Sequence, residues 1–250
     1  MALDFNGSSD ITYTLNAGQT GFSTISIAFW EWLDSNEQYR RPFHWDTGGA
    51  QDWRLEFDNG WGYALLIPWS TSDTSRAAWS IAKPSTGSWH HIVITYDGSS
   101  TSNDPIFYLN GTSTGVTERV APSGTITVPS TTLYVGSENG SGQFHDGRLA
   151  EFAIWNRVLT AGEALALGKG FAPLFSPNGL KFYTPLVGNR TSENDLMFGT
   201  AGSVDAGVTK IAHPRIIYPS FSQMRKLKGS AGVSTSVKDF LGGGFIPFAR

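Results

Sequence analysis

The chain has 250 residues, of which 13% are aromatic and 16% charged, and its formal net charge is −3. So small a charge excludes a general attraction to nucleic acid or anionic membranes. The absence of cysteine excludes disulfides and thiolate metal sites. The opening MALDFNGSSD lacks the basic and apolar regions of a secretory signal, so we expect a protein made in the cytoplasm.

Residues 2–158 consist of short runs rich in β-branched and aromatic residues, separated by clusters of Gly, Ser, Asn and Asp. Many of these runs alternate polar and apolar residues with period two, as half-buried strands do. The pattern predicts an all-β, two-sheet antiparallel jelly-roll sandwich. The clearest runs are LDF, ISIAFWEWL, WRLEF, YALLIPW, WHHIVITY, IFYLNG, TITVP, TLYVG and LAEFAIW.

The run WHHIVITYDG, residues 89–98, contains two adjacent histidines. Alternation along a strand places Trp89, His91 and Val93 on one face, and His90, Ile92 and Ile94 on the other. Because the histidines point to opposite faces, they cannot hold one metal ion together, and we expect a structural strand that ends in an Asp-Gly turn.

The sequence changes character after residue 158. In LTAGEALALGKG, Thr160 and Glu163 have capping-box spacing, which predicts a helix near 161–168 that closes a jelly-roll domain at residues 1–170. Three prolines in FAPLFSPNGLKFYTPLVGN favour an extended connector with short strands at 171–220. The last part, 221–250, is basic and Gly-rich, and we expect it to form a C-terminal arm.

Several of these segments together resemble the laminin-G-like, concanavalin A-like lectin/glucanase jelly-roll family. They are ALDFNGSSD, FSTISIAFWEWLD, WHHIVITYDG, FYLNG, TLYVGSENG and FHDGRLAEFAIWNRVLTAGEALAL, in that order. The resemblance covers residues 2 to about 168 and implies the same sandwich fold. One departure is Ala150, which stands where the family's closing strand has an aspartate, beside a retained Glu151.

A narrower resemblance covers about 40 residues of the second part. YTPLVGNRTSENDLMFGTAGSVDAG and HPRIIYPS are similar to the segment that follows such a jelly roll in tailed-phage proteins. The resemblance implies a structural protein of the virion.

The loop GSENGSGQFHDG loosely resembles a pentraxin calcium loop, with Glu138, Asn139 and Asp146, and also Gln143, as possible oxygen ligands. Calcium takes six to eight hard oxygen ligands, and a third acid is missing where Gly140 stands. We therefore expect no cofactor and favour a polar hairpin loop, with calcium as the alternative.

Glu56 and Asp58 are two residues apart, so they share one face of a strand. Some β-glucanases of this fold carry Glu-x-Asp-x-x-Glu on a strand, but Trp61 occupies the third acidic position here. With no third carboxylate and no other catalytic motif, we expect no enzymatic activity.

Four tryptophans, Trp45, Trp53, Trp61 and Trp69, recur within 25 residues. Aromatic rings stack on sugar faces, so these residues are candidates for a glycan platform. Large rings in a sandwich are more often core or interface anchors, and we favour that alternative.

Two functions remain open. The first is a non-enzymatic virion structural protein, in which the jelly roll lies on the particle surface and residues from about 211 onward pack on capsid or tail proteins and sister subunits. In this arm, Arg225, Lys226 and Lys228 would contact an acidic surface, and Phe240, Phe245 and Phe248 would enter apolar pockets. The second is a carbohydrate-binding, lectin-like module for host-surface glycans.

Overall fold

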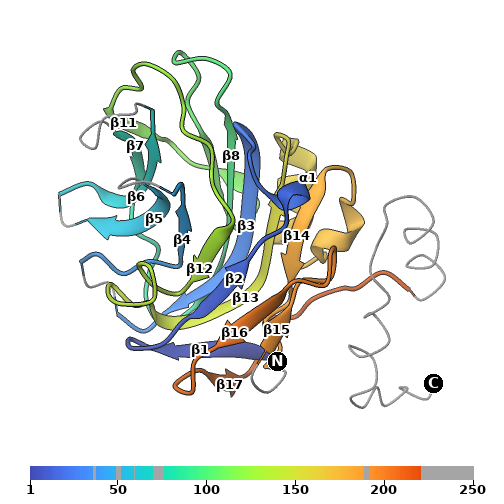
Figure 1. The fold of residues 1–250 in the computed structure, drawn as a ribbon. Coiled ribbons are helices and arrows are strands. Elements are labelled where there is room, and N and C mark those ends of the chain that lie inside the picture. Colours follow the sequence, from blue (N-terminus) through green and yellow to red (C-terminus); the bar gives the residue numbers. More distant parts are fainter. Residues whose placement is uncertain (36–37, 49–51, 59, 70–75, 189–191, 221–250) are drawn as a thin grey trace.

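The computed structural model describes residues 1–35, 38–48, 52–58, 60–69, 76–188 and 192–220. Two antiparallel sheets face each other and form a sandwich (Figure 1). Within the described ranges, no helix has the length and apolar character of a membrane span.

Sheet A contains eight strands, with β14 (Leu180–Thr184) paired to β13 beside the main path. The order along that path is β10 (Thr112–Ser113), β9 (Ile106–Leu109), β8 (Trp89–Asp97), β3 (Thr24–Leu33), β13 (Asp146–Trp155), β1 (Ala2–Asn6) and β17 (Thr209–Ile211).

Sheet B contains nine strands. Their order is β11 (Thr117–Val120), β7 (Arg76–Ile81), β6 (Gly62–Pro68), β5 (Asp52–Asp58), β4 (Phe43–Asp46), β12 (Thr132–Val135), β2 (Ile11–Thr14), β16 (Ala201–Val204) and β15 (Ser192–Asn194). The helices are α1 (Ala161–Gly168) and the 3-10 turns η1 (Ala17–Gln19) and η2 (Pro173–Phe175).

Aromatic side chains fill the space between the sheets. Phe29 of sheet A stacks on Phe152 with ring centroids 5.7 Å apart, and Phe43 of sheet B contacts both rings edge-on. A second apolar cluster lies on the outer face of sheet A, where Ala164 and Leu167 of α1 pack with Val93 and neighbouring side chains. The helix therefore covers part of the outer face of sheet A.

The histidine pair lies where alternation predicted. Ile92 and Ile94 point into the inter-sheet core, whereas Val93 packs under α1 on the outer face. His91 is buried against Trp30, with ring centroids 5.0 Å apart, and burial lowers the pKa of His91 to about 3. The division of the strand into two faces is as predicted.

The predicted helix is also confirmed. Thr160 Oγ1 accepts a hydrogen bond from the Glu163 amide at 3.2 Å, and Glu163 Oε2 accepts one from the Thr160 amide at 2.9 Å. This reciprocal capping box fixes the start of α1 where the spacing placed it.

The prediction that TITVP, residues 125–129, forms a strand is wrong. The carbonyl of Thr127 accepts the indole N–H of Trp53 at 2.7 Å, and the Thr127 amide donates to the Pro68 carbonyl. These two backbone groups bond to the Trp53 indole and to the last residue of β6, so they are not available to pair with another strand. Five strands of residues 2–158 were missing from the nine predicted runs, namely β2, β4, β7, β10 and β11.

The predicted domain boundary at residue 170 does not separate the strands of the two sheets, because strands from both sides of it pair with each other. Strand β14 pairs with β13, β17 pairs with β1, and β16 pairs with β2. Residues 180–211 thus add strands to both sheets, and the sandwich extends well beyond the segment that the sequence assigned to it.

The prediction that the chain leaves the body at about residue 211 is also wrong. Ile217 forms a parallel bridge with Phe171, and the Tyr218 hydroxyl donates to Glu151 at 2.6 Å. The segment 213–218 packs on its own chain. The predicted arm contacts of Arg225, Lys226, Lys228, Phe240, Phe245 and Phe248 lie outside the described residues.

Candidate functional site

The outer face of sheet B carries a compact group of charged side chains. Along β5, Trp53, Leu55 and Phe57 point into the core and have no exposed surface. The alternate residues Asp52, Arg54 and Glu56 therefore point outward. On β4, His44 stands directly beside Arg54, since the two residues are paired in the ladder.

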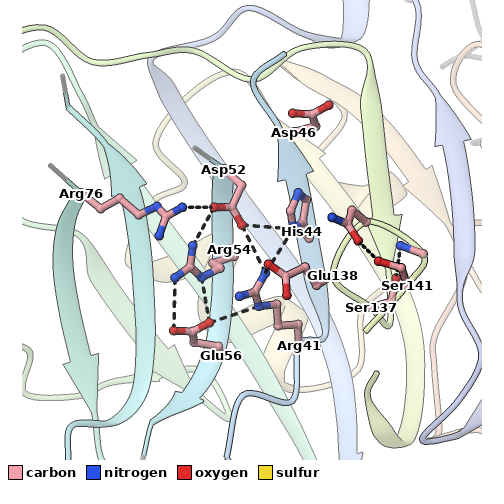
Figure 2. A network of polar contacts seen from close by, with 12 residues as sticks. Arg41, His44, Asp46, Asp52, Arg54, Glu56, Arg76, Ser137, Glu138 and Ser141 are labelled. Carbon is pink, nitrogen blue, oxygen red and sulfur yellow. Dashed lines mark hydrogen bonds and ion pairs between the residues drawn. The ribbon is translucent and has the colours of Figure 1, made fainter. Parts of the chain in front are cut away.

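Three arginines and three carboxylates meet at this position (Figure 2). Arg54 lies at the centre, with Nη1 2.6 Å from Asp52 Oδ1 and Nε 2.7 Å from Glu56 Oε2. Arg41 joins Glu56 at 3.1 Å to Glu138 at 2.8 Å. We call this set the Arg54 cluster; its members are Arg41, His44, Asp52, Arg54, Glu56, Arg76 and Glu138.

The guanidinium groups hold the Asp52 carboxylate in its charged form. Burial alone would raise the pKa of Asp52, but Arg54, His44 and Arg41 outweigh burial and lower it. Burial lowers the pKa of His44, although Asp52 lies only 3.1 Å away. With His44 neutral, three positive charges balance three negative ones, and the cluster has no net charge.

Only the edge of the cluster meets solvent. The side chains of Arg76 and Glu138 are 28% and 31% exposed, whereas those of the other five members are at most 9% exposed. Glu138 stands in a tight turn in which its amide donates to the Gly142 carbonyl at 2.8 Å and the Gly140 amide donates to Ser137 Oγ. Arg76 and Glu138 are therefore partly exposed polar groups, and each is held in place by an ion pair with a buried partner.

Two half-buried aromatic residues flank the cluster. Tyr134 of β12 contacts His44 edge-on, with ring centroids 5.5 Å apart. On the other side, Trp61 packs against Ala64, Leu66 and Ala78 on the strands that follow β5. The face thus combines fixed polar groups with rings at both sides.

Glu56 and Asp58 lie on β5 as predicted, but neither carboxylate is free. Glu56 Oε2 accepts hydrogen bonds from both Arg41 and Arg54. Asp58 Oδ1 accepts from the amides of Gly60 and Trp61, at 2.7 and 2.8 Å. Both carboxylates are therefore engaged in hydrogen bonds within the chain.

The predicted calcium ligands lie on different elements. Glu138 is paired with Arg41, and Asn139 Oδ1 accepts from the Ser141 hydroxyl. Asp146 begins β13 in sheet A, opposite Asn6 of β1. In the described part of the chain, no three His, Cys, Asp or Glu side chains gather as metal ligands would. The preference for a polar hairpin loop, with calcium as the alternative, stays a prediction.

Three of the four candidate stacking rings are in the core. Trp45 and Trp53 have no exposed surface, and Trp69 is 4% exposed. The indoles of Trp45 and Trp53 donate to the carbonyls of Ser130 and Thr127. Because a sugar cannot reach them, they do not form a glycan platform, and the core alternative favoured from the sequence holds. Of the four, Trp61 alone is half-buried.

The sequence reasoning missed most of the Arg54 cluster. The outward positions 52, 54 and 56 read Asp-Arg-Glu, a signal of opposite charges along one strand face. Arg41, Arg76 and Glu138 come from elsewhere in the chain, and nothing in their local sequence links them to β5.

A second group of aromatic residues also went unnoticed. Trp32 and Trp89 are ladder partners on the outer face of sheet A, with ring centroids 6.2 Å apart. The Arg148 guanidinium lies 4.5 Å from the centre of the Trp32 ring. This surface faces away from the Arg54 cluster.

Comparison with known proteins identifies a sequence family and structures of the same fold. The sequence model of the concanavalin A-like lectin/glucanases superfamily matches residues 6–164. Neuronal pentraxin-1 of Rattus norvegicus is 37% identical over 101 residues, which are 37% of this chain. The matched part is only 22% of that relative's length, so the chain spans about a fifth of it.

Two solved structures show the same fold. A proposed carbohydrate-binding protein from Bacteroides ovatus superposes with a TM-score of 0.60 at 15% identity, covering 86% of this chain and 61% of that one. The heptameric SAP-like pentraxin of Limulus polyphemus superposes with a TM-score of 0.54 at 15% identity, covering 85% and 95%. At this identity, the likeness shows the fold alone.

Proposed function

Because this chain belongs to the concanavalin A-like lectin/glucanases superfamily, we propose that it is a carbohydrate-binding module. Its binding face is the outer face of sheet B around the Arg54 cluster. One observation carries the proposal: a neutral, ordered network presents Arg76 and Glu138 to solvent, with Trp61 and Tyr134 on either side.

This arrangement suits the chemistry of sugars. Each sugar hydroxyl both donates and accepts a hydrogen bond, so a site that offers a guanidinium and a carboxylate side by side satisfies both roles. Aromatic rings supply flat apolar surface for the C–H faces of a pyranose. Since Arg41 and Asp52 already hold the two exposed side chains, little entropy is lost when a ligand binds.

The same geometry supports a non-enzymatic role. A retaining glycosidase needs a nucleophilic carboxylate and a protonated carboxylic acid about 5–5.5 Å apart. Here the Asp52 pKa is lowered, and Glu56 accepts hydrogen bonds from two guanidinium groups. Asp52 is therefore held in its charged form, and both oxygens of Glu56 lie within hydrogen-bonding distance of guanidinium groups, which leaves no carboxylic acid placed to protonate a leaving group.

The test is a glycan array probed with the full chain, followed by titration of a bound glycan. We expect the double variant Arg76→Ala/Glu138→Ala to lose at least ~10-fold in affinity, about 1.4 kcal/mol. Lys169→Ala, an exposed change after α1, serves as the control and should bind as the parent does. No binding to any glycan, or unchanged affinity in the double variant, would overturn the proposal.

The virion hypothesis is compatible with this role. A surface jelly roll that binds host glycans would suit a structural protein of a phage particle, and the resemblance of residues 183–207 and 213–220 to tailed-phage proteins supports that setting. The basic C-terminal residues support attachment to an acidic partner. Cosedimentation with purified particles of a candidate phage would test this attachment separately from glycan binding.

A further inference from the structure

The outward residues of β6 and β7 beyond the Arg54 cluster are small and buried. Ala64 and Ser80 are ladder partners on this face of sheet B, and they are 0% and 1% exposed. Since both point away from the inter-sheet core, their burial must come from side chains that lie over them. Trp61 packs on Ala64 and Ala78, and Arg119 Nε donates to Ser80 Oγ at 2.8 Å. Trp61 and Arg119 therefore cover this part of the sheet.

The Arg119 guanidinium is anchored along one edge only. Arg119 is an exposed residue of β11, the edge strand of sheet B, at a shift in its register with β7 (Figure 1). Its Nε and Nη2 donate to Ser80 Oγ and, at 3.3 Å, to the Trp61 carbonyl. A guanidinium has five N–H groups, so three of them, two on Nη1 and one on Nη2, have no acceptor within the described chain. We call this end of the side chain the outer fork of Arg119.

The positive charge of Arg119 has no carboxylate partner among the described residues. Its contacts there are with a hydroxyl and a carbonyl. The adjacent Glu118 points to the inner side of the sheet, because its ladder partner Trp79 is buried in the core. Arg76, in contrast, is paired with Asp52 at 3.1 Å. The Trp61 end of the face therefore offers a positive charge, whereas the Arg54 cluster is neutral.

We propose that the ligand of this face is a sugar that bears a carboxylate, a uronic acid or a sialic acid. The proposal rests on the carbohydrate-binding role proposed above and specifies the class of sugar. The outer fork of Arg119 presents parallel N–H groups, which match the two oxygens of a planar carboxylate. Trp61, whose carbonyl holds Arg119, supplies a ring beside the fork on which the pyranose can stack.

The charge of the ligand should have a measurable effect on affinity. Hydrogen bonds between charged partners are about twice as strong as neutral ones, and the anchored guanidinium loses little freedom on binding. We therefore expect the acidic sugar to bind at least ~10-fold more tightly than a neutral counterpart of the same shape. Because Arg119 is exposed, salt should screen the pair and reduce this preference.

The test uses the full chain and two matched pairs of ligands. One pair is sialyllactose and lactose, and the other is a galacturonate oligosaccharide and its carboxyl-reduced form. Titration calorimetry at low salt should show the preference for the acid in one of the pairs, which identifies the kind of acid. In Arg119→Gln the preference should disappear, while affinity for neutral glycans and the melting temperature stay as in the parent. Arg119→Lys, which keeps the charge but not the fork, should retain only part of it.

Two control variants separate the fork from other effects. Arg215→Gln removes an equal charge from an exposed residue of the segment 213–218, beside the loop after α1, and should keep the full preference. Arg76→Ala/Glu138→Ala leaves the net charge unchanged and should weaken binding of both the acid and its neutral partner.

The failure of this proposal differs from a failure of glycan binding itself. Equal affinity for the acid and its neutral partner, or binding of neutral glycans alone, would overturn the acidic ligand and leave carbohydrate binding intact. A preference for the acid that survives in Arg119→Gln, or that is lost equally in Arg215→Gln, would overturn the role of the fork. If the parent chain binds no glycan at all, the proposed function and this inference are both wrong.

Discussion

Glu31 shows how a single residue sets the pH dependence of this sandwich. The side chain lies between the sheets with no exposed surface, and the Tyr63 hydroxyl lies 2.9 Å from both carboxyl oxygens. Burial raises the pKa of Glu31 from 4.5 to about 8, although the Tyr63 hydrogen bond opposes this rise. The folded protein thus keeps a proton on Glu31 that the unfolded chain releases, and the contribution of Glu31 to stability falls as the pH rises from about 4.5 to about 8.

We therefore predict that Glu31→Gln stabilises the protein at pH 8 relative to the parent. The gain in the free energy of unfolding should be largest at pH 8. It should decrease by on the order of 1 kcal/mol for each pH unit towards pH 4.5. Urea unfolding at the two pH values measures it. Glu163→Gln is the control: Arg157 lowers the pKa of Glu163 to about 2, so its contribution is lost only as the pH falls from about 4.5 to about 2, and the effect of this substitution should be nearly the same at pH 8 and at pH 4.5. A gain from Glu31→Gln that is equal at both pH values would contradict this account.

At the scale of elements, the loop between β12 and β13 tests the calcium hypothesis. The Glu138 carboxylate is committed to Arg41 at 2.8 Å, so a cation would have to displace an ion pair that is largely buried on the Arg41 side. We predict that the melting temperature is the same with EDTA and with millimolar calcium. A calcium-dependent rise that disappears in Glu138→Gln would show that the loop binds the ion.

The segment 213–218, which Tyr218 joins to Glu151, supplies a second prediction at this scale. Tyr218→Phe removes a hydrogen bond to a buried carboxylate, a change that costs about 1.5–3 kcal/mol. Because the loss is local, hydrogen exchange of the Ile217 and Ala172 amides should accelerate at least ~10-fold while exchange in β3 and β8 stays as before. Tyr39→Phe, at a residue 44% exposed, is the matched control. Unchanged exchange at both amides would mean that the hydrogen bond to Glu151 does not stabilise the segment 213–218.

Elements with local signals were predictable from the sequence. The capping box of α1 and the alternation of β8 involve residues within one turn or one strand, and both predictions are confirmed. The failure at TITVP has a non-local cause, since the Trp53 indole donates to the carbonyl of Thr127 inside this run and the Trp45 indole donates to the carbonyl of Ser130 just after it.

The Arg54 cluster shows the same distinction between local and non-local signals. Alternation along β5 is local and predicts that Asp52, Arg54 and Glu56 share one face. Their partners Arg41, Arg76 and Glu138 lie elsewhere in the sequence and could not be predicted.

For the whole molecule, the sheets define a unit larger than the predicted domain. Phe182, Tyr183 and Leu186 are fully buried, and β14, β16 and β17 pair with strands of the first 170 residues. We predict that residues 1–220 fold and melt cooperatively, whereas residues 1–170 do not, because truncation exposes both sheets and part of the core. Circular dichroism with thermal melting of the two fragments is the measurement. Cooperative melting of the shorter fragment near the temperature of the full chain would contradict this unit.

The central claim is that the outer face of sheet B binds carbohydrate, and backbone NMR with a glycan identified on the array tests it most directly. The account predicts that the amide shifts that change on titration belong to β4, β5, β12 and the Glu138 turn, together with the indole of Trp61. It also predicts that these changes disappear in Arg76→Ala/Glu138→Ala. Changes confined to Trp30, Trp32, Trp89 and Arg148 on the outer face of sheet A would contradict it.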